Sequence, residues 1–274
     1  MTTDPTPTRS YETVKVWQRE GAATIELARP DRLNAWNRQL GVDLLDAVRW
    51  ATEEETVRAV VVRGEGRGFS SGADLKDMGP GHDRTPDGKP DVRKRLTELY
   101  HPILTGIRRM PKPVVAAVRG PAVGIGCSLA LVCDLIVADE SAYFMLAFVN
   151  IGLVPDGGSS ALLPSRVGMT RAIEMALLGE RVPAAQALEW GLINRVWPAE
   201  RFDAEVDDLA ARLAAGPTRS YAGSKRQLNA WIYGDFDRQL DLEADIQQEM
   251  AGSGDFLEGV MAFVEKRPAR FTGA

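Results

Sequence analysis

Cysteine and histidine are scarce in this 274-residue sequence, which contains two of each. Cys127 and Cys133 lie six residues apart with no second ligand pair nearby, a spacing that does not match a zinc motif. The histidines, His82 and His101, are too few to complete one. We therefore expect no metal site, and we expect both thiols to be buried as small apolar groups.

Long hydrophobic runs and an excess of basic residues are also missing. No apolar stretch approaches the ~20 residues that a membrane-spanning helix needs. The net charge of −5 argues against a general binding surface for nucleic acid or for an anionic membrane. Residues 1–8 lack the basic and apolar regions of a signal peptide, so we expect a cytoplasmic protein in which residues 1–10 form a disordered tail.

The remaining composition is that of a globular protein, with 45% hydrophobic and 26% charged residues. Up to Pro155 the hydrophobic pattern alternates between strands and helices. We expect strands at 11–17, 23–27, 57–63, 114–118 and 135–138, and helices at 38–53, 92–107 and 127–133. The segment 114–138 is then a strand–helix–strand unit, which predicts parallel strands and an α/β fold.

After Pro155 the pattern becomes mainly helical. Helices are expected at 160–163, 170–178, 184–190, 202–214, 221–232 and 236–250. This change predicts a sheet-containing core over residues 11–200 and a C-terminal helical region over residues 201–274.

Two glycine-rich turns are the most informative motifs. Residues 119–126 are Arg-Gly-Pro-Ala-Val-Gly-Ile-Gly, and residues 70–75 are Ser-Ser-Gly-Ala-Asp-Leu. Each turn follows a Val-rich strand and leads toward a helix, where the first backbone N–H groups have no partner within the helix. Two such turns facing each other supply two donors to one oxyanion, an arrangement that suits thioester substrates.

These segments resemble the crotonase (enoyl-CoA hydratase/isomerase) superfamily. The resemblance runs from residues 23–36, which include Arg32-Leu33-Asn34-Ala35-Trp36, to Phe-Val-Glu-Lys-Arg at 263–267, and so covers almost the whole chain. It implies a spiral of ββα turns, with terminal helices that pack between subunits in a trimer or a dimer of trimers. Residues 79–90, rich in glycine, proline and charge, are expected to form a mobile loop that borders the acyl pocket.

The resemblance also implies a set of binding residues. The N–H groups of Ala73 and Ile125 would form the oxyanion hole for an acyl-CoA carbonyl. The expected contacts with coenzyme A or the acyl group are Arg29, Leu33, Ala35, Ala73, Asp74, Leu75, Gly124, Phe263 and Lys266. Arg29 and Arg32 are candidates for the phosphates, with solvated loop arginines as the alternative. Phe263 and Lys266 would reach the nucleotide bound to a neighbouring subunit. No separate cofactor is expected, because coenzyme A is part of the substrate.

Both glutamates that the family's hydratases use are replaced. Aligned through residues 124–127, the first falls on Ser128; aligned through Phe144 and residues 151–155, the second falls on Phe148. Serine is not a carboxylate base near neutral pH, and phenylalanine has no proton to give. The usual two-carboxylate hydration mechanism is therefore not expected.

Asp156, in Val-Pro-Asp-Gly-Gly at 154–158, is the leading replacement for the lost carboxylates. The same motif position carries an aspartate in phenylacetate-pathway isomerases and in aromatic acyl-CoA dehalogenases, which this segment resembles. A helix cap or turn residue is the structural alternative. His101 matches the position of a dehalogenase base, and a histidine at the pocket edge or on the helix surface is the alternative. Ser128 is expected to be a small polar residue without a proton-transfer role.

The sequence therefore predicts an acyl-CoA enzyme, and we favour an isomerase that moves a double bond or opens an epoxide through an enolate. The alternatives are a hydratase with an unassigned base, a dehalogenase or thioester hydrolase, and an acyl-CoA-binding protein with a decayed active site. Neither a nucleic acid nor a membrane is expected as a partner.

Overall fold

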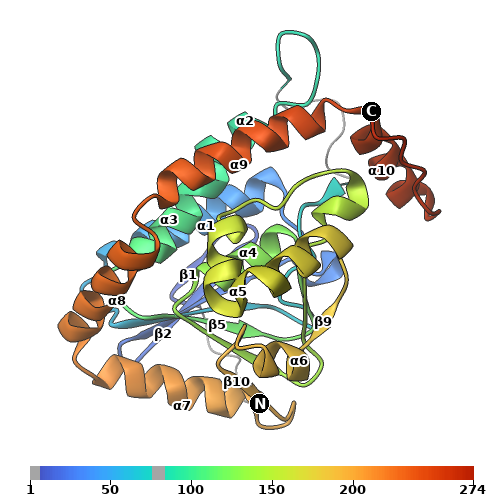
Figure 1. Cartoon of the computed structure of the whole chain (residues 1–274). Helices are drawn as coiled ribbons and strands as arrows, with labels where there is room; N and C mark the ends of the chain where they lie inside the picture. Colours follow the sequence, from blue (N-terminus) through green and yellow to red (C-terminus); the bar gives the residue numbers. More distant parts are fainter. Residues whose placement is uncertain (1–6, 76–83) are drawn as a thin grey trace.

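The computed structural model describes residues 7–75 and 84–274, which are organised around a mostly parallel sheet (Figure 1). Its strands, in spatial order, are β1 (Arg9–Ser10), β2 (Val14–Arg19), β3 (Ala22–Leu27), β4 (Ala59–Gly64), β5 (Val114–Val118), β7 (Leu135–Asp139) and β10 (Arg195–Trp197). The pairs β1–β2 and β2–β3 are antiparallel, and each later pair is parallel. The α/β class and the parallel β5–β7 unit are therefore confirmed.

The sheet begins nearer the N-terminus than expected. Arg9 and Ser10 pair with β2, so the predicted tail over residues 1–10 is wrong for these two; residues 1–6 lie outside the described residues. The strand expected at 11–17 is also displaced, to β2. The cause is a turn in which the Tyr11 N–H donates to the Val14 carbonyl at 2.8 Å.

Both faces of the central strands are buried. Strands β4 and β5 read Ala-Val-Val-Val-Arg-Gly and Val-Val-Ala-Ala-Val, the continuous apolar pattern of parallel strands covered on two sides. Helices α1 (Arg38–Glu53) and α3 (His101–Arg109) pack on one face. Helix α7 (Phe202–Ala215) packs on the other, with Phe202 and Val206 in one cluster with Val61, Val115 and Val137. Residues on both sides of the predicted boundary at 200 therefore share this cluster.

The helix expected at 92–107 is present in three parts: α2 (Val92–Arg95), the π-helical η3 (Leu96–Tyr100) and α3. Single π-helical turns are often found beside functional sites. Of the loop predicted over 79–90, residues 79–83, His82 among them, lie outside the described residues. The rest forms a short turn in which the Thr85 N–H donates to the Lys89 carbonyl at 2.9 Å.

A small second sheet carries the chain toward the candidate site. It contains β6 (Pro121–Val123), β8 (Tyr143–Met145) and β9 (Val182–Pro183) in the order β6-β8-β9. Gly120, with φ of +58°, turns the chain from β5 into β6, and β6 leads through Gly124 into α4 (Ile125–Val132). Two short 3₁₀ segments, η1 (Pro30–Arg32) and η4 (Phe148–Ile151), lie in the loops before α1 and after β8.

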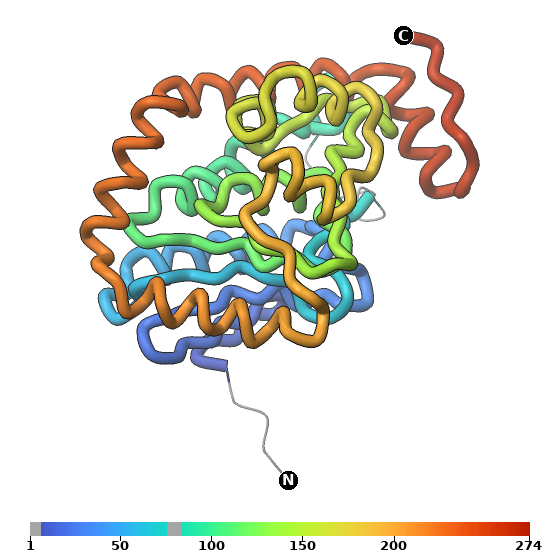
Figure 2. The backbone as a smooth tube through the Cα atoms, turned by 60° about the horizontal axis from the view of Figure 1, so that its bottom comes forward, coloured from blue at the N-terminus to red at the C-terminus, as the bar shows by residue number. Residues whose placement is uncertain are grey.

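The C-terminal half is mainly helical, as predicted. Its helices besides α7 are α5 (Ser159–Leu178), α6 (Ala184–Glu189), α8 (Thr218–Ile232), α9 (Phe236–Ala251) and α10 (Gly254–Glu265). Gly168, with φ of +75°, breaks α5 between the two helices expected there. Helix α9 contacts both α2 and α5, and Figure 2 shows the orange and red C-terminal helices passing around the outside of the earlier elements. No helix in the described part of the chain is long and apolar enough to cross a membrane.

Candidate active site

The loop over residues 29–36 is bonded to the turn over residues 70–75. The Trp36 N–H donates to the Gly72 carbonyl at 2.8 Å, and the Asp74 N–H donates to the Trp36 carbonyl at 2.9 Å. The buried Asn34 side chain fixes the loop from inside, since its amide donates to the Gly68 carbonyl at 2.8 Å. The two segments therefore form one wall.

The two glycine-rich turns are in direct contact. A Cβ atom added to Gly72, whose φ is +91°, would lie 2.9 Å from the Val123 carbonyl oxygen. A Cβ atom added to Gly126 would lie 2.8 Å from the Ser70 carbonyl oxygen. Because backbone occupies the space of both side chains, only glycine lets the start of α4 lie against the 70–75 turn.

Two backbone donors remain free where these turns meet. Ile125 is the first residue of α4, so its N–H has no acceptor within the helix. Within the described residues, neither this N–H nor that of Ala73 has a hydrogen-bond partner. Both residues line one cavity of about 560 Å³. Two such donors can bind one anionic oxygen, helped by the positive N-terminal end of the helix.

The cavity brings together most of the residues predicted from the sequence. Those that line it are Leu33, Ala35, Ala73, Asp74, Leu75, Gly124, Ile125, Phe148, Asp156 and Phe263. Arg29, His101, Ser128 and Lys266 do not line it, and neither does any residue of 84–90. Tyr100 and Leu96, from the π-helical turn, add to its wall.

Phe263 reaches the cavity of its own chain, whereas the resemblance implied a neighbouring subunit. The reason is the docking of α10 on η4. A Cβ atom added to Gly259 would lie 2.6 Å from the Ile151 Cα atom, so the two backbones touch. Lys266, the residue after α10, is exposed and lies outside the cavity wall.

Of the two arginines predicted to bind phosphate, only Arg32 lines the cavity. Arg29 is held by the loop itself, since its guanidinium pairs with the Asp74 carboxylate at 3.1 Å and also donates to the Ala35 carbonyl. Three further arginines that the sequence did not single out also line the cavity: Arg67, Arg95 and Arg181.

His101 lies apart from the cavity wall, buried at the start of α3. Burial lowers the pKa of its imidazole, and the charges that act on it most are those of Asp241, which opposes that effect, and Arg93. Its Nε2 atom has no partner within the described residues. The structure therefore does not bring His101 to the two free N–H groups.

The turn that carries Asp156 lies against the first turn of α4. Gly157 and Gly158 have φ of +68° and +81°, so the chain turns sharply after the aspartate. A Cβ atom added to Gly157 would lie 2.8 Å from both the Ile125 Cδ1 and the Ser128 Cβ atoms. This contact sets Asp156 beside the helix that supplies one of the free donors.

Three helices hold Asp156. Its backbone carbonyl accepts hydrogen bonds from the hydroxyls of Ser128 and Ser159, each at 2.8 Å. Its carboxylate Oδ2 accepts from the Gln247 amide at 2.9 Å. Within the described residues Oδ1 has no partner, although the residue is only 5% exposed. Burial raises the pKa of Asp156 to about 8, and the nearby Glu243 carboxylate contributes to the rise.

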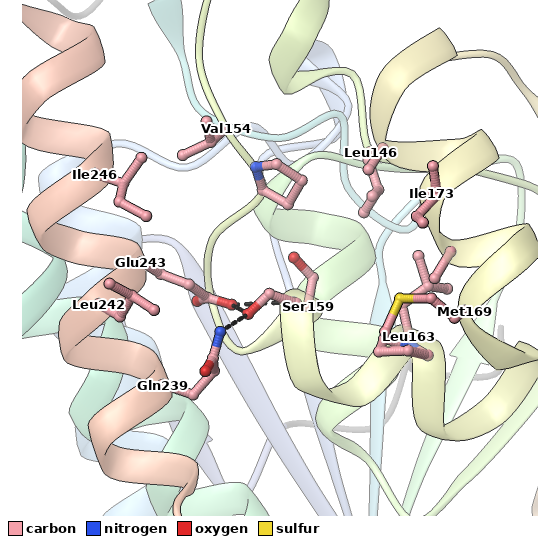
Figure 3. A pocket seen from close by; sticks show the side chains of 15 residues that line it. Leu146, Val154, Ser159, Leu163, Met169, Ile173, Gln239, Leu242, Glu243 and Ile246 are labelled. Atoms are coloured by element: carbon pink, nitrogen blue, oxygen red, sulfur yellow. Dashed lines mark hydrogen bonds between the residues drawn. The ribbon is translucent and has the colours of Figure 1, made fainter.

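Glu243 lies on α9 one helical turn before Gln247, and it binds the chain segment that follows Asp156. Its carboxylate accepts from the backbone N–H groups of Gly158, at 2.7 Å, and Ser160, at 3.0 Å, and from the Ser160 hydroxyl. Figure 3 shows Glu243 and Gln239 pointing from α9 toward the start of α5, across a second, apolar cavity of about 280 Å³. Burial raises the pKa of Glu243 to about 7, against the lowering effect of these hydrogen bonds.

The sequence reasoning missed both Glu243 and Gln247. A signal was present, because the two polar residues fall on the apolar face of α9. The buried residues of that face are Phe236, Leu240, Glu243, Ala244, Gln247 and Ala251. Among the described residues, no group of three histidine, cysteine, aspartate or glutamate side chains is arranged to hold a metal ion.

Comparison with known proteins shows the family of this chain. The family model described as enoyl-CoA hydratase/isomerase matches residues 18–274. The chain therefore belongs to the enoyl-CoA hydratase/isomerase family, the crotonase superfamily.

Individual relatives carry different activity names. The chain is 42% identical, over 96% of its length and 99% of the relative's, to a probable enoyl-CoA hydratase of Rhodobacter capsulatus. It is 39% identical, over 93% of its length and 96% of the relative's, to a 1,2-epoxyphenylacetyl-CoA isomerase of Escherichia coli. The crystal structure of an enoyl-CoA hydratase from Mycobacterium avium subsp. paratuberculosis matches with a TM-score of 0.86 at 41% identity, covering 96% of this chain and 100% of that one.

Proposed function

We propose that this protein is an acyl-CoA isomerase in which Asp156 moves a proton on an enolate that the Ala73 and Ile125 N–H groups stabilise. The observation that carries the proposal is the Asp156 carboxyl itself. It is buried in the wall of the cavity that holds both free donors, and one of its oxygens has no partner in the described chain. Buried carboxyls with a raised pKa are typical of proton-transfer groups.

The proposed reaction on a 3-enoyl thioester has two proton transfers. The Asp156 carboxylate takes a proton from the α-carbon, and the electron pair left behind delocalises onto the thioester oxygen, where the two N–H groups bind it. The same carboxyl then returns the proton to the γ-carbon, which gives the 2-enoyl thioester and restores the carboxylate. No water and no electron acceptor are consumed.

The surroundings of Ser128 and Phe148 support this proposal over hydration. Ser128 is fully buried and donates its hydroxyl to the Asp156 carbonyl. Phe148 presents a hydrocarbon side chain to the cavity. Neither offers the carboxylate that the family's hydratases use at the matching positions. The relative named 1,2-epoxyphenylacetyl-CoA isomerase extends the proposed substrates to epoxide or ring-type acyl groups.

Binding of coenzyme A is proposed at the arginine-lined part of the cavity, with Arg32, Arg67 and Arg181 as partners for the phosphates. A homotrimer or a dimer of trimers is proposed for the assembly. Apolar side chains exposed on α5 and α10 support it, since burial against other subunits would remove them from water. These are Met169, Ile173, Leu177, Leu178, Leu257, Met261 and Val264.

Substrate screening tests the proposal. We expect purified protein to convert 3-enoyl-CoA to 2-enoyl-CoA and to exchange the α-protons with solvent deuterium, since both need the enolate. Hydration of crotonyl-CoA should be at least about a hundredfold slower than isomerisation, because a general base for water is missing. Absorbance of the enoyl thioester follows both reactions. Rapid hydration of crotonyl-CoA would favour the hydratase alternative, and failure to turn over any acyl-CoA would favour a binding protein.

The rate of isomerisation should depend on pH through Asp156. The base form is needed, and burial raises the pKa of Asp156 to about 8. Below that pH the carboxyl is mostly protonated, so kcat/KM should rise about tenfold per pH unit and level off near pH 8. A profile of kcat/KM measured from about pH 6 to pH 9 tests this expectation. A flat profile across that range would contradict the assignment of the base.

A further inference from the structure

Gln247 is a fully buried polar side chain on a helix that starts 80 residues after Asp156. It lines the cavity, and its amide nitrogen donates to Asp156 Oδ2 at 2.9 Å. Its amide oxygen is also buried and has no partner among the described residues. Burying an amide oxygen without a hydrogen-bond partner lowers the stability of the folded protein. Its presence here therefore indicates that Gln247 has a role other than stabilising the fold.

We propose that Gln247 is a positioning residue that holds the Asp156 carboxyl in one orientation in both of its protonation states. This inference rests on the proposed role of Asp156 as the proton carrier. It assigns to α9 a function in the reaction, in addition to its packing against α2 and α5.

An amide is suited to this task because its NH₂ group is an uncharged donor. It donates to Oδ2 of the ionised carboxylate, as in the structure. When Oδ1 takes the proton, Oδ2 becomes the carbonyl oxygen of the acid and still accepts the same hydrogen bond, more weakly than the carboxylate does. A lysine or an arginine would add a charge that favours the carboxylate, and an apolar side chain would satisfy neither form.

The position of Gln247 is fixed by its neighbours on α9. Glu243, four residues earlier, bonds the two backbone N–H groups that follow Asp156, and Ala244 and Ala251 are buried on the same face. The groups that contact Asp156 from α4 and α5 are neutral serines, so Glu243 is the ionisable group in the described chain that acts on its charge. With Oδ2 held by Gln247, Oδ1 is the oxygen available for proton transfer.

The test compares Gln247→Met with Gln248→Met. Methionine keeps an unbranched chain of similar length but makes no strong hydrogen bond. Gln248 is the matched control, because it is the next residue and its amide bonds Pro90 and Arg93 instead. We expect Gln247→Met to lower kcat for isomerisation by roughly tenfold or more, with KM changed less than about twofold. Gln248→Met should behave as wild type.

A second measurement reports on Asp156 directly. Infrared difference spectra against Asp156→Asn give the pH at which the Asp156 carboxyl loses its proton. The hydrogen bond from Gln247 lowers the pKa of Asp156, so its loss in Gln247→Met should move this midpoint upward by about one pH unit. Gln247→Leu, which also has no donor, should move the midpoint in the same direction.

The outcomes separate the two proposals. Full activity of Asp156→Asn would overturn the proposed function. An inactive Asp156→Asn together with wild-type kcat and an unchanged infrared midpoint in Gln247→Met would overturn only the role of Gln247. If Gln247→Met does not fold, Gln247→Leu decides the question by the same two readouts, and an unchanged midpoint there has the same meaning.

Discussion

Replacing Asp156 by asparagine is expected to lower kcat for isomerisation by at least about a hundredfold. Asparagine keeps the size of the side chain and its ability to bond Gln247, but it has no carboxyl group that can take and return a proton. Exchange of the α-protons with solvent deuterium should be lost in parallel, because enolate formation needs the base. On one substrate, absorbance measures the rate of isomerisation and mass spectrometry measures the exchange of α-protons for deuterium.

The same substitution should make the folded protein more stable near neutral pH. In the unfolded chain Asp156 ionises around its ordinary pKa of 3.8, whereas in the folded protein burial raises the pKa to about 8. The folded wild type therefore retains a proton that the unfolded chain has lost, and it loses stability as the pH rises from about 4 to about 8. Asparagine is free of this cost, so its melting temperature should exceed the wild-type value by about 5 °C or more at pH 8.

The control for both measurements is Asp245→Asn, which changes an exposed carboxylate on α9 that pairs with Arg93. It should alter neither the rate nor the pH dependence of melting by much. The stability difference between wild type and Asp156→Asn should also vanish near pH 4. An Asp156→Asn variant that isomerises like wild type would reduce this residue to a turn former.

Ile125→Pro should also cause a large loss of activity. Proline removes the backbone N–H at the first position of α4, where the helix geometry tolerates it. With one of two donors gone, kcat should fall roughly 10²–10³-fold, and the affinity for coenzyme A alone should change little. Steady-state kinetics and calorimetry with acyl-CoA and free coenzyme A separate the two effects.

Ile125→Ala is the matched control, because it loses the same buried side chain but keeps the N–H. The isoleucine side chain is 2% exposed, so both variants lose packing and only the proline variant loses the donor. Equal activity of the two variants would show that the Ile125 N–H does not bind the developing oxyanion.

The strands and helices around the two free N–H groups were predictable because the apolar patterns and glycines that define them lie within each segment. The Val-rich runs of β4 and β5 and the apolar spacing of α1 gave strands and helices within a few residues of those observed. The glycines at 72 and 126 marked the turns, and the contacts that require them are now visible. The strand expected at 11–17 was displaced because a turn at Tyr11 sets where β2 begins.

The surroundings of Asp156 were beyond prediction for a different reason. Glu243 and Gln247 act on it across sequence separations of about 90 residues, and hydrophobic periodicity says nothing about which distant turn a helix face will meet. The predicted helix over residues 236–250 contains both residues, and the structure places them on its buried face. A glutamate and a glutamine on such a face are costly unless they are paired, and that conflict was the available clue.

The contact between Gly157 and Ser128 limits how this active site can evolve. The position of a Cβ atom on Gly157 lies 2.8 Å from the Ser128 Cβ atom, so the turn that presents Asp156 occupies the space into which a longer side chain at residue 128 would grow. A glutamate at residue 128 would therefore be expected to shift this turn, so its introduction would change the placement of Asp156 as well as the chemistry at residue 128.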